Sequence, residues 1–258
     1  MRLYFHYLSM HLKTCMAHKK SFFLYALGQF LTSFTEFVAL WFLLDRFKTV
    51  GGYTIGECAL CFGVMVMSFS LMECFFRGFD HFTALVRSAD FDRLLVRPRG
   101  LVFQVLCHKV EFGRLGKLVQ SAIALGIGIA LSPIEWSFAR AGVLILMIAG
   151  GTIVFAGIAW IYAGLCFFTL EGLECVNVFL HGARDFGKYP LDVYGKALLR
   201  FCTFVIPYAL FQYYPLTYLL GRSNDPLRAL APLGTPLFLI PCAILWTIGV
   251  KKYKSAGS

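Results

Sequence analysis

Charged side chains are scarce in this sequence. Only 15% of its 258 residues are Asp, Glu, Lys or Arg, whereas 59% are hydrophobic, and the mean hydropathy is +0.70. A soluble domain has about a quarter charged residues. The apolar residues here form long uninterrupted runs instead of the periodic stripes of a soluble helix. This composition excludes an ordinary soluble domain and indicates that the bilayer surrounds most of the chain.

Motifs that would make this chain an enzyme are also missing. The sequence has no HExxH motif, and the pair Cys58 and Cys61 has no second pair or His nearby to complete a metal site. Residues 182–189 resemble a P-loop, but Tyr189 stands where Ser or Thr would hold magnesium. We therefore expect no catalytic residue, metal or cofactor on this chain, and any ATP and Mg to be bound by another chain.

The apolar runs predict an all-α polytopic membrane protein with six transmembrane helices and both termini in the cytoplasm. Residues 1–20 are aromatic and basic and predict an interfacial helix on the cytoplasmic side. Residues 77–117 are rich in Arg and Lys and predict a cytoplasmic loop. The six predicted spans are 21–44, 57–76, 118–134, 141–170, 190–221 and 229–250.

The predicted fifth span contains two prolines and several tyrosines. Proline interrupts helices and tyrosine favours the membrane interface. We expect this helix to begin at Pro190 on the cytoplasmic side and to end or kink near Pro207, with residues 213–221 folding back on the outer side. The residues expected in this outer re-entrant or gate region are Pro207, Tyr208, Tyr213, Tyr214 and Pro215.

The distribution of basic residues predicts the orientation. With the N-terminus inside, 19 of the 24 Lys and Arg residues fall in cytoplasmic segments, among them residues 184–200. Inside the third span, Ala122, Gly126 and Ala130 recur at four-residue spacing, which allows close helix contact. Glu36 is a candidate intramembrane polar site; pairing with a neighbouring helix and exposure to an aqueous cavity are both open.

Several sequence blocks resemble one family. The loop Arg87–Arg99 (RSADFDRLLVRPR) resembles the cytoplasmic loop of bacterial ABC-2 type permeases. The resemblance extends in family order to Tyr189–Tyr194 (YPLDVY), to Val205–Ala209 (VIPYA), and to the YPL and LLG sequences that follow before residue 222. It implies a six-helix, type V-like exporter fold in the bacterial cytoplasmic membrane, surrounded by lipids and paired with a second permease as a homodimer or heterodimer.

The resemblance also implies a function. Each permease would dock onto a separate cytoplasmic ABC ATPase subunit and move an amphiphilic or hydrophobic compound, such as a drug, peptide or lipid, out of the cell. The loop would carry a coupling helix seated in a cleft of the ATPase, with Phe91 as the buried anchor and charges at its rim. The residues expected to couple to the ATPase are Asp90, Phe91, Asp92, Arg93, Leu94, Arg97 and Pro98.

Two alternatives compete with this interpretation. A secondary transporter or channel would work without an ATPase, but such proteins usually show several ionisable residues in mid-membrane or inverted repeats, and neither is evident. The loop Asp90–Arg99 would otherwise only cap a helix and face lipid headgroups. The net charge of +10 does not favour nucleic-acid binding, because no RNA-binding aromatic motif accompanies it.

Overall fold

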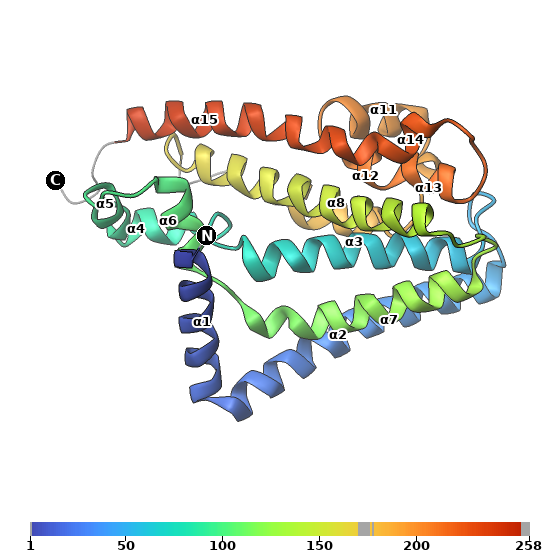
Figure 1. The fold of residues 1–258 in the computed structure, drawn as a ribbon, viewed down its shortest axis with the longest axis horizontal. Helices are drawn as coiled ribbons and strands as arrows, with labels where there is room; N and C mark the ends of the chain where they lie inside the picture. The colour runs from blue at the N-terminus through green and yellow to red at the C-terminus, as the bar shows by residue number, and fades with distance from the viewer. Residues whose placement is uncertain (1, 170–175, 177, 254–258) are drawn as a thin grey trace.

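The computed structural model describes residues 2–169, 176 and 178–253. Long helices lie side by side along one axis (Figure 1), and the described residues contain no strand. We call the end that holds α1 (Arg2–Ala17) and the C-terminal end of α15 (Leu239–Lys252) the N-terminal end. The far end holds the connection between α2 (Lys19–Phe47) and α3 (Ile55–Phe75). The prediction of an all-α fold is confirmed for the described residues.

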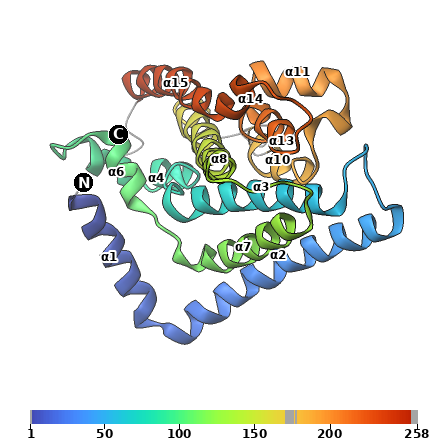
Figure 2. The same cartoon turned by 45° about the vertical axis from the view of Figure 1, so that its right-hand side comes forward.

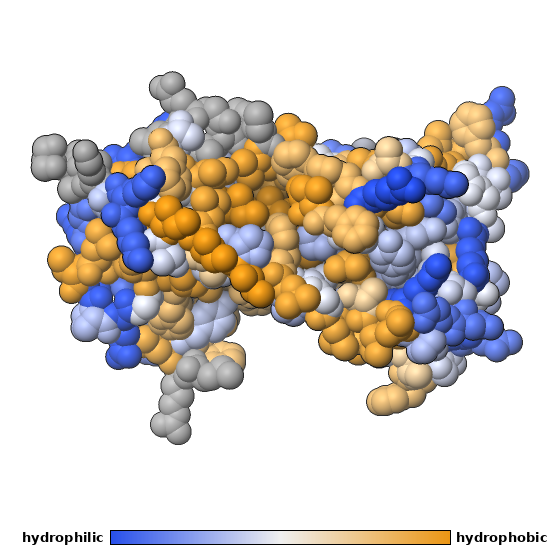
Figure 3. Space-filling view, turned by 90° about the horizontal axis from the view of Figure 1, so that it is seen from above, coloured by the Kyte–Doolittle hydropathy of each residue, from blue (hydrophilic) through white to orange (hydrophobic). Residues whose placement is uncertain are grey.

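Five helical segments of the described residues are long and apolar enough to cross a membrane. Besides α2 and α3, they are α7 (Leu115–Leu131) with its preceding turn, α8 (Phe138–Leu165), and the run Pro226–Lys252. This last run is made of α14 (Pro226–Leu230), η4 (Ala231–Phe238) and α15. Figure 3 shows apolar side chains covering the middle of one face, with most hydrophilic side chains toward the two ends.

Helix α3 is the centre of the bundle, since 83% of its most apolar stretch is buried, against 22% for α2. Glycines allow α7 to approach both neighbours: a Cβ on Gly128 would lie 2.7 Å from the Leu60 nitrogen, and one on Gly116 would collide with the Ala26 carbonyl. The prediction for Ala122, Gly126 and Ala130 is wrong within this chain, because all three are exposed. Packing uses the opposite face of α7.

The predicted fifth span is not one broken helix. Residues 190–221 form the short elements η3 (Leu191–Tyr194), α11 (Lys196–Phe204), α12 (Tyr208–Phe211) and α13 (Tyr213–Leu219). Gly195 takes a φ of +93° and Gly221 a φ of +66°, which side-chain-bearing residues rarely adopt. Pro207 is the N-cap of α12. A proline at this position does not continue the preceding helix. The segment is therefore divided by glycines at positive φ and by a proline, not by a decrease in hydropathy.

The start of this segment also lies at the other end from the one predicted. The Tyr53 hydroxyl donates a hydrogen bond to Asp192 over 2.9 Å, so Asp192 is at the far end beside the α2–α3 connection. Lys196 follows on α11, which is drawn at the same end (Figure 1). The prediction that Pro190, Asp192, Lys196 and Arg200 share the end of the N-terminus is therefore wrong. The N-terminal end therefore holds fewer Lys and Arg residues than the sequence predicted. It still holds more of them than the far end.

The end of α8 and the start of η3 lie at opposite ends of the bundle. Thr83, in the loop at the N-terminal end, contacts Cys166 just after α8, whereas Asp192 is at the far end. Between them lie the π-helix η2 (Val178–Gly182) and α10 (Ala183–Phe186). Residue 170, the predicted end of the fourth span, and Lys254 lie outside the described residues.

Two elements close the N-terminal end. Helix α1 lies across it, at a sharp angle to the long helices (Figure 2). The loop after α3 folds into three short helices, α4 (Phe82–Arg87), α5 (Asp90–Leu95) and α6 (Leu101–His108). The predicted loop region 77–117 is thus mostly helical, and its last residues already belong to α7.

Candidate functional site

The α4–α6 loop is fastened to the long helices by aromatic side chains. The ring centroid of Phe91 lies 5.0 Å from that of Phe82 and 5.0 Å from that of Tyr253. Phe167 and Trp246 complete the cluster, with Trp246 5.0 Å from Phe82. Aromatic pairs in such edge-to-face contact stabilise a core beyond their buried area. The cluster joins α4 and α5 to the ends of α8 and α15.

Phe91 is therefore not available to a partner cleft, and the prediction that it anchors the loop in an ATPase is wrong. Its side chain is completely buried inside this chain, and Leu94 is buried beside it. The sequence reasoning went wrong because a phenylalanine between two aspartates is expected to need an external partner, whereas the amphipathic turn places it against the bundle. The tip of the loop instead exposes Val96 (84%) and Leu95 (40%).

The polar residues predicted around Phe91 lie on the outer surface of the loop. Asp90 accepts hydrogen bonds from Ser88 over 2.8 Å and from Arg93 over 3.1 Å. Arg97 and Pro98 are exposed at the tip beside Val96, and Asp92 is partly exposed. The loop thus presents two apolar side chains next to basic residues. Whether this tip contacts an ATPase stays a prediction.

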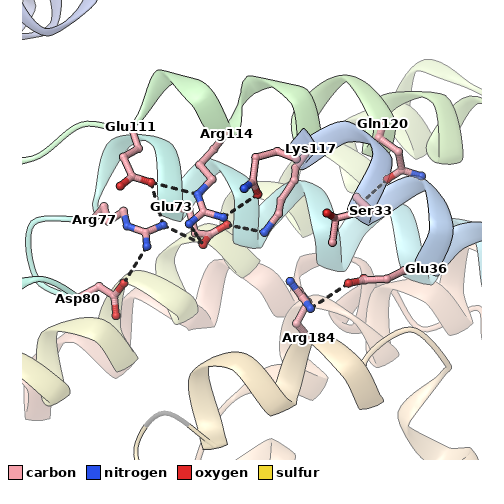
Figure 4. Close-up of polar contacts among 12 residues, drawn as sticks. Ser33, Glu36, Glu73, Arg77, Asp80, Glu111, Arg114, Lys117, Gln120 and Arg184 are labelled. Carbon is pink, nitrogen blue, oxygen red and sulfur yellow. Dashed lines mark hydrogen bonds and ion pairs between the residues drawn. The ribbon is translucent and has the colours of Figure 1, made fainter. Parts of the chain in front are cut away.

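A second set of contacts, the Glu73 network, holds the base of the loop. One Glu73 oxygen lies 3.0 Å from Arg77 and 3.3 Å from Arg114, and the other lies 3.1 Å from Lys117 (Figure 4). The side chains of Glu73 and Lys117 are 4% and 7% exposed. One carboxylate thus joins α3, the start of the loop and α7. Removing Glu73 would leave the buried Lys117 without its counter-charge, which is strongly destabilising.

Glu111 extends the Glu73 network from the other end of the loop. It lies 3.1 Å from both Arg77 and Arg114, and Arg114 also donates to Gln29 of α2 over 2.8 Å. Burial acts to raise the pKa of Glu111, but Arg77 and Arg114 outweigh it and lower this pKa. The carboxylate is therefore ionised at neutral pH and pairs with both guanidinium groups.

Glu36 is paired with the segment that follows α8. Its two oxygens lie 3.1 Å from Arg184 and 3.3 Å from Lys188, and the guanidinium of Arg184 also lies over the Phe69 ring (Figure 4). Of the two possibilities left open by the sequence, the structure shows pairing with a neighbouring segment. Asp185 contacts the same two cations at 3.6 and 3.0 Å. These four side chains connect the middle of α2 to α10.

At the far end, single contacts hold the connection between α2 and α3. Arg222 stacks on the Tyr53 ring at 3.8 Å and lies 3.3 Å from Glu57. Glu57 also accepts from the Thr54 backbone over 2.7 Å, which closes the capping box of α3. The bond from Tyr53 to Asp192 adds the segment after residue 190 to this group.

The predicted gate residues divide between the core and the far-end surface. Tyr208 and Pro215 are buried, and the Tyr208 hydroxyl donates to the Phe179 carbonyl. Tyr213 and Tyr214 are partly exposed neighbours in α13, while Pro207 caps α12. The structure therefore brings these five residues into one region, but it does not show a re-entrant path or a gate.

Sequence reasoning missed three sets of polar residues that connect elements of the structure. Lys117 and Glu73 are opposite charges at the edges of two apolar runs, and this was the available signal for their pairing. Arg184 and Lys188 were assigned to a cytoplasmic segment. Gln212 is completely buried and donates to the carbonyls of Gly187 and Tyr189 over 2.9 and 2.8 Å. No local pattern marks Gln212, because its partners are distant backbone groups.

Comparison with known families identifies the chain. The sequence profile described as ABC-2 family transporter protein matches residues 30–257. No curated protein and no solved structure matches the chain. The match covers part of α2, the other four long helical segments, the loop and the far-end elements, that is, most of what the structure describes. The chain belongs to the ABC-2 family of transporter proteins.

Proposed function

We propose that this chain is the permease subunit of an ABC exporter that moves an amphiphilic or hydrophobic compound out of the cell, using ATP hydrolysed by a separate subunit. Family membership supports a membrane component of a transporter. The direction of transport, the substrate and the ATPase partner are parts of the proposal.

The main support for the proposal is that the α4–α6 loop is attached to the long helices by two separate sets of contacts. The aromatic cluster ties it to α8 and α15, and the Glu73 network ties it to α3 and α7. A displacement of the exposed tip is therefore transmitted to four long helices. An element that receives force from a cytoplasmic ATPase requires this combination of an exposed tip and a rigid base.

The docking contact is assigned to the tip rather than to Phe91. Leu95 and Val96 are exposed apolar side chains beside Arg97, so a partner cleft gains apolar burial from the first two and charge complementarity from the arginine. Hot spots of interfaces are commonly apolar groups enclosed by such a polar rim. The second permease is proposed to complete a dimer whose two loops each engage one ATPase subunit.

The membrane topology in this proposal has six crossings and both termini in the cytoplasm. Five crossings are the long helical segments, and the passage between α8 and η3 makes the sixth. This topology differs from the sequence prediction in the position of α11. In a cysteine-free variant, cysteines at Thr49, Lys196 and Asp225 should react with an impermeant maleimide added outside cells. A cysteine at Ser88 should be protected, and labelling at Lys196 together with Ser88 would contradict the topology.

The function is tested by purification from the native membrane. The tagged chain should copurify with a subunit that binds ATP, and Val96→Asp should reduce the amount of that subunit, because it places a charge in the apolar contact. Thr49→Ala at the exposed far end is the control. Reconstituted alone, the chain should hydrolyse no ATP; with the partner it should support ATP-dependent export.

The secondary-transporter alternative makes the opposite prediction. Robust transport by the isolated chain under a proton gradient would support it and exclude the proposal. Unchanged copurification of the ATPase with Val96→Asp and Leu95→Asp would show that the tip is not the docking contact.

A further inference from the structure

A cavity of about 270 Å³ lies at the N-terminal end between α1 and the α4–α6 loop. Tyr7 and His11 of α1 form one wall, and His108 of α6 belongs to the opposite one. Arg97 and Arg99 reach the cavity from the turn between α5 and α6. No acidic residue is among the described residues that line it. The cavity is separate from the Glu73 network and from Leu95 and Val96, and it shares only Arg97 with the docking contact proposed above.

The walls of this cavity are fixed by contacts within the chain. The His11 imidazole is hydrogen-bonded to the Cys107 carbonyl over 3.0 Å, which holds α1 against α6. The Gln104 amide donates to the carbonyls of Leu94 and Arg99 over 3.1 and 2.8 Å. These two bonds set the path of the turn that carries Arg97 and Arg99. The two guanidinium groups are thus presented by an ordered turn.

The charge of the cavity favours an anion. A guanidinium stays protonated in proteins and matches the oxygens of a phosphate with paired N–H donors. Asp90 pairs with Arg93 on the outer surface of the loop, and this ion pair involves neither cavity arginine. Arg97 and Arg99 therefore add positive charge that no lining carboxylate compensates.

The border of the cavity favours a ligand with an apolar part. Leu3, Met10 and Phe103 line it, and Leu3 and Met10 are 39% and 50% exposed. Phe5, on the same helix, is 64% exposed. Helix α1 lies across the end of the bundle (Figure 2), as an interfacial helix does at the level of the headgroups. A free phosphate would gain nothing from these apolar side chains, whereas acyl chains would cover them.

We propose that this cavity binds the phosphate of an anionic phospholipid headgroup from the leaflet at the N-terminal end. Arg97 and Arg99 bind the phosphate, and the acyl chains lie over the apolar residues of α1. One lipid would then contact both α1 and the loop and hold them together. The proposal goes beyond the proposed function, because it requires a membrane but no ATPase.

The experiment uses the full chain, purified in detergent and freed of lipid. Dioleoyl phosphatidylglycerol and dioleoyl phosphatidylcholine are titrated separately, and bound lipid is measured by native mass spectrometry. We expect tighter binding of phosphatidylglycerol, and a loss of about thirtyfold in its affinity for Arg97→Gln/Arg99→Gln, given the usual contribution of each basic residue near an anionic lipid. Affinity for phosphatidylcholine should fall much less, because its choline ammonium offsets the charge of its phosphate.

The matched control is Arg87→Gln/Arg93→Gln, which removes the same charge from exposed positions of the same loop outside the cavity. This variant should bind phosphatidylglycerol like the unmodified chain. Glycerol 3-phosphate in the same assay separates the two sources of phosphate: it should not displace the lipid at equal concentration. If the double variant fails to elute as a folded species, the single variants Arg97→Gln and Arg99→Gln should each show an intermediate loss.

Three results would overturn the proposal. Equal affinity for the two lipids would remove the charge selectivity. An equal effect of the cavity and control variants would show a general charge effect. Displacement by glycerol 3-phosphate would assign the cavity to a soluble phosphate. None of these measurements depends on an ATPase, so the proposed function can fail while the lipid site holds, and the reverse.

Discussion

The two ends of the bundle are held together in different ways. At the N-terminal end, Glu73 alone contacts three cations whose side chains are 7–13% exposed. At the far end, Glu57 contacts the single cation Arg222, whose side chain is 37% exposed. Ion pairs in water contribute little, whereas buried networks cost much when one member is lost. The difference indicates that a buried charge network holds the N-terminal end, whereas a single, partly exposed ion pair supports the far end.

The backbone of the two ends supports the same contrast. The loop at the N-terminal end is held by an aromatic cluster that includes residues of α15. The far end contains Gly195 and Gly221 at positive φ and a proline at the start of α12, so its elements are separated by points of bending. In a transporter, the first end would transmit force and the second would rearrange around substrate.

The largest expected effect is at Glu73. Replacing it with Ala leaves Arg77, Arg114 and Lys117 close together without their shared carboxylate, so the free energy of unfolding should fall by roughly 3–5 kcal/mol. Thermal unfolding in detergent would show this as a clear decrease in Tm. Asp45→Ala, which removes an exposed pair with Lys48, is the control and should leave Tm unchanged. A Tm for Glu73→Ala equal to that of the control would abolish the proposed contrast between the ends.

The second effect separates the two apolar parts of the loop. Phe91→Ala removes a fully buried ring from the aromatic cluster and should destabilise the protein by about 3 kcal/mol. Val96→Ala removes exposed atoms and should leave stability unchanged while weakening copurification of the ATPase. Tm and copurification are measured for both variants. Unchanged Tm in Phe91→Ala would contradict the cluster seen here.

The third effect tests the far end. Tyr53→Phe keeps the ring under Arg222 but removes the hydroxyl that donates to Asp192, so the expected loss is about 1 kcal/mol. Because this hydrogen bond joins the α2–α3 connection to η3, hydrogen exchange should increase in residues 191–204 and stay constant in the loop at the N-terminal end. Increased exchange at both ends would show that the ends are not independent.

The sequence was sufficient for the parts of the fold that depend on local hydropathy. The long apolar runs predicted α2, α3, α7 and α8 as helices, because a span must be apolar over its whole length. The same reliance on hydropathy gave a wrong prediction for residues 190–221, which were expected to form one span. The break near Pro207 was predicted from the proline itself and is confirmed, but Gly195 and Gly221 also divide the segment, and hydropathy takes no account of φ.

The site was harder to predict because its contacts are distant in sequence. Glu36 was recognised as unusual, yet its partner Arg184 lies 148 residues away. Phe91 was correctly chosen as an apolar residue that must be buried, but sequence does not show whether the covering surface belongs to the same chain. The pairing of Glu73 with Lys117 required knowing that α3 and α7 are neighbours.

The smallest expected effect concerns pH at the N-terminal end. His81 Nε2 accepts from Arg77 Nε over 3.0 Å and lies 3.1 Å from Lys109 Nζ. Burial, followed by the charges of Lys109 and Arg77, lowers the pKa of His81 from its usual 6.5, although Asp80 and Glu111 act in the opposite direction. The folded state therefore favours the neutral imidazole. The corresponding stability is complete above pH 6.5 and is lost as the pH falls from 6.5 through the lower folded pKa.

His81→Gln sharpens this prediction, since the amide oxygen still accepts a hydrogen bond but does not titrate. Tm measured from pH 8 to pH 5.5 should fall less steeply in His81→Gln than in the unmodified chain, because the variant lacks the group that the unfolded state protonates more readily. His6→Gln, at an exposed position of α1, is the control and should follow the unmodified chain. Parallel curves for His81→Gln and the unmodified chain would show that protonation of His81 does not contribute to the pH dependence of stability.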